Sequence, residues 1–327
     1  MMDTRIALAA LAAALRTSRG LAAKADIGPV SARLGVSAAA ATPVGDDCAA
    51  LPDGDGFLLF AIEGFINEFV AADPWFAGWC GVMVNLGDVA AMGGRPLAVV
   101  DAVWADGEPQ AGAILDGLRA ASERYGVPIV GGHTNLRSDR SQLSVAVLGR
   151  AKRLLTSFDA RPGDRLVMAV DLRGRWRAPF SNWEAATEAP AARLRGDLAL
   201  LPEIAEAGLA AAAKDISQGG VIGTAAMLAE ASGVAITIDV GAVPRPPDAP
   251  LERWLTTFPS FGYLLAVAPA DVAAVTGRFA ARGLASADIG AIAAGSQVAI
   301  ADGGAVEPVW DHRARPLLRG DAREAAA

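Results

Sequence analysis

The spacing of hydrophobic and polar positions changes several times along the chain, and it predicts a mixture of helices and strands. Apolar residues at Ile6, Leu8, Leu11 and Leu15 predict an amphipathic first helix. Short apolar runs bounded by glycine, proline or aspartate predict strands. These runs are residues 57–62, 96–105, 127–135, 142–150 and 165–172, followed by 234–241, 261–268, 287–292 and 297–302. Helical patterns at 108–126, 189–213, 214–233 and 269–283 alternate with the strands, which indicates mixed sheets with helices on one face.

The most informative segment is a strongly apolar helix that is expected to begin after Asp73 and Pro74 and to end at a pair of glycines. Its polar residues Asn85 and Asp88 are three apart, so they share one face of the helix. A carboxylate in such an apolar setting stays charged only if a cation or strong donors meet it. On this segment alone, a capping or surface aspartate is an equal alternative.

The alternating pattern breaks near residues 152–166, where Arg161-Pro162-Gly163-Asp164 forms a turn signal. We therefore expect an N-terminal domain over residues 1–151 and a C-terminal domain over residues 152–327. Two loops are expected, one over residues 41–56 and one over the arginine- and tryptophan-rich stretch 173–188. The second loop either clamps a planar or anionic substrate or forms a mobile surface or dimer contact.

Composition excludes several classes of protein. The 327 residues are 53% apolar, and the net charge of −7 with no basic block argues against a nucleic-acid partner. The isolated Cys48 and Cys80 fit a reducing cytoplasm, and two histidines disfavour zinc sites and most Ser-His-Asp triads. No apolar run reaches the roughly 20 residues of a membrane span. The first apolar run with Ala23-Lys24-Ala25 imitates a secretory signal, but the charges around it favour a helix of a cytoplasmic protein.

Acidic residues beside glycines recur where strands or helices are expected to end, which is where α/β scaffolds place function. They are Asp46 and Asp47 in VGDDCAA, Glu63 in AIEG, Asp88 in VNLGD and Asp215 in KDISQGG. Each motif alone is ordinary turn chemistry, whereas together they suit Mg²⁺ that bridges phosphate oxygens. No GxxxxGK[ST] loop occurs, so we expect backbone N–H groups of a glycine turn such as Gln218-Gly219-Gly220 to hold phosphate.

In chain order, these motifs resemble the AIR synthase-like (PurM-type) superfamily over nearly the whole length. The matching segments are GDDCAALP, AIEGFINEFV, VNLGDVAAMGGRPL, PIVGGHTN, ARPGDRL and KDISQGG. The most specific of them, VNLGDVAAMGGRPL, is most similar to the equivalent segment of thiamine-monophosphate kinase. The resemblance implies a two-domain α/β (α+β) architecture, an N-terminal sheet that dimerises, and ATP with Mg²⁺ in the cleft between the domains.

The resemblance also implies roles for single residues. Metal ligands are expected at Asp47, Glu63, Asp88 and Asp215, with Glu63 standing where the family has the Asp of a Thr-Asp pair. Nucleotide contacts are expected from Asp46, Asp47, Asn85, Asp88, His133, Asp215, Gly219 and Gly220, and catalysis from Asp47 and His133.

Three departures from the family pattern affect the expected site. His133 replaces an acid of the family's GGD or GGE, and Gln218 replaces the second acid of DISDG, so two negative charges are missing. Fewer Mg²⁺ ions then bind, or His133 contacts phosphate or acts as an acid or base. The alternative for His133 is a buried imidazole whose hydrogen bonds are all satisfied. The alternative for Gln218 is a side chain that hydrogen-bonds to its own turn. FPSFGYLL at 258–265 occupies the place of the kinase's GEDYELL, so the substrate is left open.

From these features we expect an ATP- and Mg²⁺-dependent phosphotransferase, or an AIR synthase-like ligase, that acts on a small molecule as a homodimer. The alternative within the class is thiamine-monophosphate kinase. From another class, the alternative is a nucleotide-binding accessory protein with reduced catalysis, which the two lost acids favour. Metal-dependent hydrolysis without ATP is disfavoured by the scattered acids.

Overall fold

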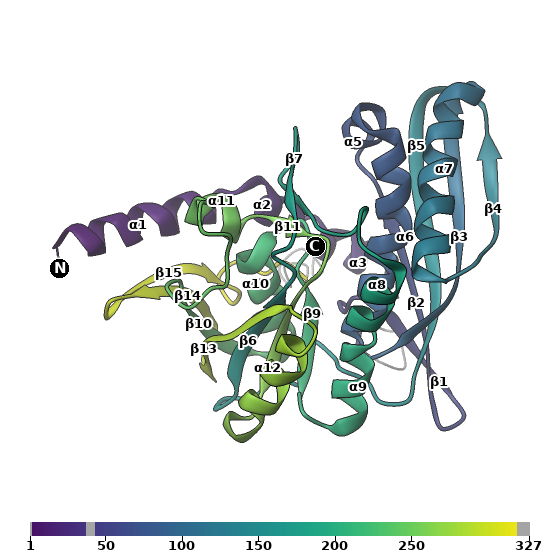
Figure 1. Cartoon of the computed structure of the whole chain (residues 1–327). Coiled ribbons are helices and arrows are strands. Elements are labelled where there is room, and N and C mark those ends of the chain that lie inside the picture. The colour runs from purple at the N-terminus through teal and green to yellow at the C-terminus, as the bar shows by residue number, and fades with distance from the viewer. Residues whose placement is uncertain (1, 37–42, 319–327) are drawn as a thin grey trace. The chain divides into compact units, whose positions relative to one another are not determined.

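The structure, a computed structural model, describes residues 2–36 and 43–318, with side chains from residue 7 onward (Figure 1). The chain forms two compact units, each built from segments on both sides of residue 151. One unit, here called the five-strand unit, comprises Asp47–Leu154 and Ala185–Glu206. The other, the seven-strand unit, comprises Met1–Asp46, Leu155–Glu184 and Ala207–Ala327.

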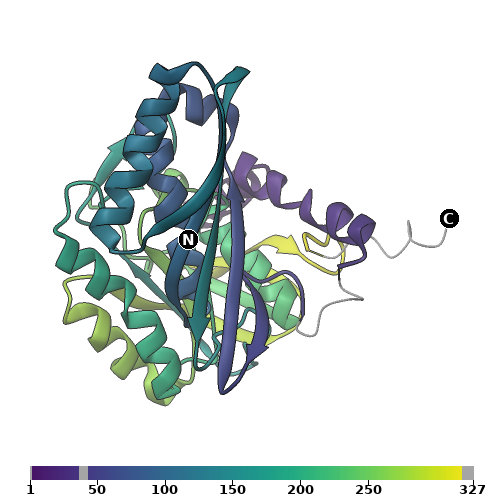
Figure 2. The same cartoon turned by 90° about the vertical axis from the view of Figure 1, so that its right-hand side faces the viewer.

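The five-strand unit is a mixed sheet with the strand order β1-β2-β5-β3-β4. Its strands are β1 (Ala49–Asp53), β2 (Gly56–Gly64), β3 (Arg95–Asp106), β4 (Ile129–Asn135) and β5 (Arg137–Ala151). Its helices are α5 (Asn67–Ala72), α6 (Pro74–Ala91), α7 (Glu108–Tyr125) and α8 (Ala191–Leu198). Neighbouring strands are antiparallel except β3 and β4, which run parallel through the α7 crossover. Helices α6 and α7 lie side by side on one face of the strands (Figures 1 and 2), which confirms the expected mixed sheet.

The helix α6 begins as the sequence predicts. The carboxylate of Asp73 accepts from the N–H of Phe76 at 3.3 Å, and Pro74 occupies the first turn. Glycines then let α6 and α7 meet at backbone distance, because a Cβ on Gly78 would collide with the carbonyl oxygen of Ile114. On the other helix, a Cβ on Gly117 would collide with the carbonyl oxygen of Trp75. The helix α6 is therefore buried on nearly every side, and not only on one face.

The two faces of this sheet differ sharply in burial. Residues on the helix side, such as Leu59 and Val145, are fully buried. Residues on the opposite face stay open: Phe60 is 52% exposed and Ile62 is 65% exposed. Phe60 lies opposite Leu148 on β5, which is itself 38% exposed, so the open face carries neighbouring apolar side chains.

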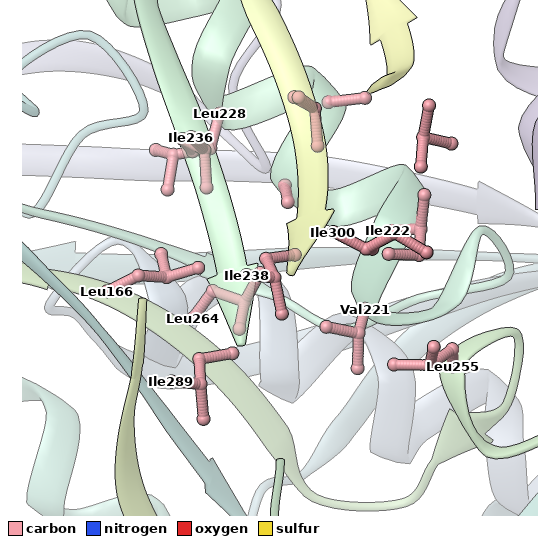
Figure 3. Packing of buried hydrophobic residues seen from close by; sticks show 14 of the residues in the cluster. Leu166, Val221, Ile222, Leu228, Ile236, Ile238, Leu255, Leu264, Ile289 and Ile300 are labelled. Atoms are coloured by element: carbon pink, nitrogen blue, oxygen red, sulfur yellow. The ribbon is translucent and has the colours of Figure 1, made fainter. Parts of the chain in front are cut away.

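The seven-strand unit contains a second mixed sheet with the order β15-β14-β10-β13-β6-β12-β9. Its strands are β6 (Arg165–Val170), β9 (Ala212–Asp215), β10 (Val234–Asp239), β12 (Gly262–Val267), β13 (Ala285–Ala294), β14 (Gln297–Asp302) and β15 (Ala305–Asp311). The helices of the second half are α9 (Leu200–Ala207), at the boundary between the units, α10 (Gly220–Ser232), α11 (Leu251–Leu255) and α12 (Val272–Ala280), with a short 3-10 turn η1 (Pro269–Asp271). Figure 3 shows strand residues such as Ile238 and Ile300 packed against Val221 and Ile222 of α10.

Three N-terminal helices complete the seven-strand unit: α1 (Met2–Arg16), α2 (Arg19–Lys24) and α3 (Ile27–Leu34). Leu8, Leu15 and Leu21 are buried in its core, which confirms the amphipathic first helix. No described helix is long and apolar enough to cross a membrane.

The structure corrects four local predictions. Part of the loop expected over 41–56 is the strand β1, which pairs with β2, while residues 41 and 42 lie outside the described residues. The strand at 127–135 is real, but β4 is exposed because it lies at the sheet edge and pairs with β3 alone. The helical stretch expected to reach residue 213 ends at Ala207 and is followed by β9, and the sequence did not predict β15.

The fourth correction concerns the stretch 173–188, which forms β7 (Arg175–Arg177) and β8 (Asn182–Glu184) instead of a loop. Together with β11 (Phe258–Pro259) these strands make a three-stranded sheet. Trp183 is buried, its Nε1 donates to the carbonyl oxygen of Asp171 at 3.0 Å, and its ring meets that of Trp254 edge to face. Trp183 is therefore a core residue, which rules out a clamp or a mobile loop at this side chain.

Candidate metal and nucleotide site

Two of the predicted metal ligands, Asp47 and Asp88, meet within the five-strand unit. Each offers a carboxylate oxygen that lies within 4.8 Å of the other's. Asp88 is 5% exposed on α6, and Asp47 is half-buried just before β1. Two carboxylates at this spacing repel each other unless a positive group lies between or beside them. The pair is therefore a natural place for a divalent cation.

Asn85 supplies a further oxygen one helical turn before Asp88. It is fully buried, and its Nδ2 donates to the carbonyl oxygen of Gly81 at 2.8 Å. Its Oδ1 has no hydrogen-bond partner among the described residues. A buried oxygen left without a donor costs free energy, and a bound ion or its water would satisfy it. Carboxylate and amide oxygens are the ligands of hard cations, so the donor set fits Mg²⁺.

The structure does not bring Glu63 and His133 to this pair. Glu63 is half-buried on β2 opposite Val145, and in the described part of the chain it does not join Asp47 and Asp88 at the 4.8 Å spacing. His133 is exposed on β4, and its ring centroid lies 6.0 Å from that of Trp104. The alternative of a buried, satisfied imidazole at His133 is therefore wrong. The histidine that replaces the family's acid thus lies on β4, a solvent-exposed strand.

Asp46 forms hydrogen bonds within the seven-strand unit. Its carboxylate accepts from the N–H of Ser157 at 2.8 Å and from the Oγ of Ser157 at 2.6 Å. Ser157, which engages both oxygens, lies three residues after the first segment of the five-strand unit ends at Leu154. This contact anchors the polypeptide at the last residue of the first segment of the seven-strand unit.

Asp215 ends β9 in the seven-strand unit, where it is 8% exposed and lies opposite Tyr263 of β12. The glycine turn that follows is buried at Gly219 and Gly220, while Gln218 is exposed. Gly220 has φ of +62°, and a Cβ there would collide with the carbonyl oxygen of Leu255, so only glycine fits. The N–H of Gly220 donates to the carbonyl oxygen of Ser217 at 2.8 Å and is used inside the turn.

Asp101 is a further acid that the sequence did not single out. It is half-buried on β3, and partial removal from water raises the pKa of its carboxyl group above the usual range. Gly132 of β4 lies directly beside it, and a Cβ at Gly132 would be 2.7 Å from the Oδ2 of Asp101. The signal was present as an acid inside the apolar run PLAVVDAVWA, two residues from each of the buried Val99 and Val103 and therefore on the same face of the strand.

The chain matches two domain families along its length. Residues 45–151 match the AIR synthase related protein N-terminal domain, and residues 161–303 match the AIR synthase related protein C-terminal domain. The chain belongs to the AIR synthase related family, with the two-domain α/β architecture that the motifs predicted.

Similar proteins include an uncharacterized protein and a thiamine-monophosphate kinase. An uncharacterized protein of Synechocystis sp. is 48% identical over 276 residues, which is 84% of this chain and 85% of that protein. The thiamine-monophosphate kinase of Methanospirillum hungatei is 32% identical over 222 residues, or 63% of this chain and 72% of the kinase. The predicted likeness to thiamine-monophosphate kinases is thus confirmed.

Solved structures agree on the fold. AaThiL complexed with AMPPCP and TMP superposes with a TM-score of 0.67 at 24% identity, covering 88% of this chain and 97% of that one. T. maritima PurL complexed with ADP gives a TM-score of 0.71 at 20% identity over 84% of this chain. The chain spans about half of PurL, since the match covers 46% of the PurL chain.

Proposed function

We propose that this protein is an ATP- and Mg²⁺-dependent enzyme that transfers the γ-phosphoryl group to a small metabolite. The observation that carries the proposal is the pair Asp47 and Asp88, whose carboxylate oxygens lie within 4.8 Å of each other. The kinase relatives and the nucleotide-bound structural neighbours support ATP as the phosphate donor.

In this proposal Asp47 and Asp88 hold Mg²⁺, and the Oδ1 of Asn85 orients the ion or one of its waters. A magnesium ion held there would supply positive charge that offsets the charge of the nucleotide's phosphate groups. Asp215 remains a proposed member of the ligand set, whereas Glu63 does not join Asp47 and Asp88 within the described part of the chain. The N–H of Gly219 is the proposed phosphate donor in the glycine turn, because that of Gly220 is already used.

His133 remains a proposed acid or base, or a phosphate contact, in place of the family's acid. Its exposure on β4 leaves the imidazole accessible to a substrate. A different observation favours the alternative of a nucleotide-binding accessory protein: among the described residues, His133 and Glu63 do not join Asp47 and Asp88. Turnover of nucleotide distinguishes the two functions.

We also propose a homodimer formed through the open face of the five-strand unit. Phe60, Ile62 and Leu148 expose apolar surface there, which a second copy would cover. The two buried thiols, Cys48 and Cys80, support a reducing cytoplasm as the proposed location.

Calorimetry with the full chain tests the function. ATP should bind in the presence of Mg²⁺ and at least tenfold more weakly with EDTA, a difference of about 1.4 kcal/mol. Equal binding under both conditions would contradict a cation-held nucleotide. Incubation with ATP, Mg²⁺ and thiamine monophosphate then tests the thiamine-monophosphate kinase alternative, since phosphorylated product is expected only if that molecule is the acceptor.

A further inference from the structure

The N-terminal helices lie outside both matched family regions, yet they are built into the seven-strand unit. The helices α1 to α3 end at Leu34, whereas the match begins at residue 45. Leu15 and Leu21 are fully buried in the core of this unit. This segment therefore contributes to the unit that carries Asp215 and the glycine turn.

This segment makes a close backbone approach where α2 meets the turn that precedes α10. A Cβ on Gly20 would collide with the carbonyl oxygen of Gln218 and would lie 3.1 Å from the Cα of Gly219. The two backbones are thus in direct contact at Gly20. Leu21 packs beside them, with its Cδ1 at 4.0 Å from the Cβ position of Gly223 in the first turn of α10.

Several contacts hold α2 in this place. The Oγ of Ser18 caps α2 by accepting from the N–H of Leu21 at 3.4 Å. Before it, Nη2 of Arg16 donates to the carbonyl oxygen of Pro308 at 2.7 Å. After it, the N–H of Gly28 donates to the carbonyl oxygen of Leu317 at 3.1 Å. The chain is therefore anchored on both sides of Gly20, to β15 before it and to Leu317 after it.

The opposite side of the turn is closed as well. Gly220 faces the backbone of Leu255 and Thr256 at the end of α11, and any Cβ there would collide with both. The turn from Gln218 to Gly220 thus lies between α2 and α11, with backbone contact on each side. Because the turn is in backbone contact on both sides, a displacement of α2 towards it must also displace the turn.

We propose that α2 is a positioning element for the candidate nucleotide site, and that Gly20 is the positioning residue. Gly20 touches the backbone of Gln218. It thereby sets the direction of the N–H of Gly219 and of the carboxylate of Asp215, which lies three residues before Gln218. The inference rests on the proposed function for the role of that turn. Misplacement by about 1 Å at such a site costs on the order of 100-fold in productive binding or turnover.

The test is Gly20→Ala, with Gly277→Ala of α12 as the matched control in the same unit. Gly277 has nothing within 4 Å of its Cβ position, so alanine fits there without displacing a neighbour. We expect Gly20→Ala to raise the Kd of Mg²⁺-bound ATP at least tenfold and to speed hydrogen exchange at residues 215–223 at least threefold. Adenosine, which has no phosphate, should bind both variants as it binds the wild type. A glycine with only a structural role would lower the unfolding midpoint without this selectivity for phosphate.

Unchanged exchange at residues 215–223 together with a Kd within twofold of the wild type would overturn the inference. If Gly20→Ala does not fold, Leu21→Ala loosens the same helix and is read by the same two measurements. A wild type that does not bind nucleotide would contradict the proposed function alone. Faster exchange at residues 215–223 in Gly20→Ala would still establish the contact between α2 and the turn.

Discussion

The guanidinium group of Arg195 lies over Gly126 at the end of α7. Its Nη2 donates to the carbonyl oxygen of Glu123 at 2.8 Å and its Nε to that of Arg124 at 3.0 Å. These carbonyls belong to the last turn of α7, where helices have no partners of their own. Gly126 has φ of +75°, and a Cβ there would lie 2.7 Å from the guanidinium carbon. One side chain from α8 thus caps the helix that crosses over from β3 to β4.

The cap predicts a measurable loss of stability in Arg195→Ala. Two hydrogen bonds to exposed helix-end carbonyls contribute about 1 kcal/mol in total. Urea unfolding should therefore show a lower midpoint, equivalent to a loss of about 1 kcal/mol in the free energy of unfolding. Arg119→Ala is the control, because Arg119 is exposed on α7 and makes only a surface pair with Asp116 at 3.1 Å. A similar loss in both variants would contradict the capping role.

The second prediction concerns the carboxylate pair Asp47 and Asp88. Asp88→Asn removes a charge but keeps the shape, so the Kd of Mg²⁺-bound ATP should rise at least tenfold, about 1.4 kcal/mol. Titration calorimetry measures this directly. Asp116→Asn, an exposed aspartate of the same unit, should leave the Kd unchanged. An unaltered Kd in Asp88→Asn would remove the proposed metal site.

The third prediction is a pH dependence that arises at Asp101. Because burial raises the pKa of this carboxyl group in the folded state, the folded protein holds the proton more tightly than the unfolded chain. The resulting stability is fully present below the ordinary value near 3.8 and is lost as pH rises through the folded pKa. Asp101→Asn should therefore unfold at higher urea than the wild type at pH 7, and the difference should shrink toward pH 4.

Asp106→Asn is the control for this experiment, since Asp106 lies exposed at the end of the same strand. Its unfolding midpoint should follow the wild type at both pH values. If Asp101→Asn is less stable than the wild type at pH 7, the carboxylate is stabilised by a partner, and desolvation does not dominate.

The fourth prediction addresses the open face of the five-strand unit. Ile62→Asp places a charge where a second copy would bury an apolar side chain, so light scattering should show a monomer. Val306→Asp, at a valine that is 55% exposed on β15 of the other unit, should leave the dimer intact. A wild type that is monomeric at micromolar concentration would contradict this interface.

Local rules predicted the parts of the fold that depend on neighbouring residues. Asp73 and Pro74 marked the start of α6 because capping and a proline at the first turn act within four residues. The spacing of Asn85 and Asp88 likewise placed two polar side chains on one face of that helix. The pattern of acids beside glycines had singled out Asp47 in a distant part of the chain, and the resemblance assigned it the role of a metal ligand.

Long-range contacts explain what the sequence did not show. Gly78 and Gly117 look like ordinary helix glycines, and only the meeting of α6 and α7 makes them necessary. Trp183 resembled a surface aromatic, but it is buried against Trp254, which is 71 residues later in the chain. Asp101 required knowledge of which face of β3 the helices cover. These features depend on partners that lie far apart along the chain.

The interleaved order of the two units restricts how this chain can be divided. The polypeptide passes between them after Asp46, Leu154, Glu184 and Glu206. A gene fragment that ends at residue 154 would lack the Arg195 cap of α7, and the complementary fragment would lack the leucines of α1 and α2 from its core. Recombination that exchanges either half with a homologue would have to carry compensating pieces from the other, so the two units are expected to be inherited together.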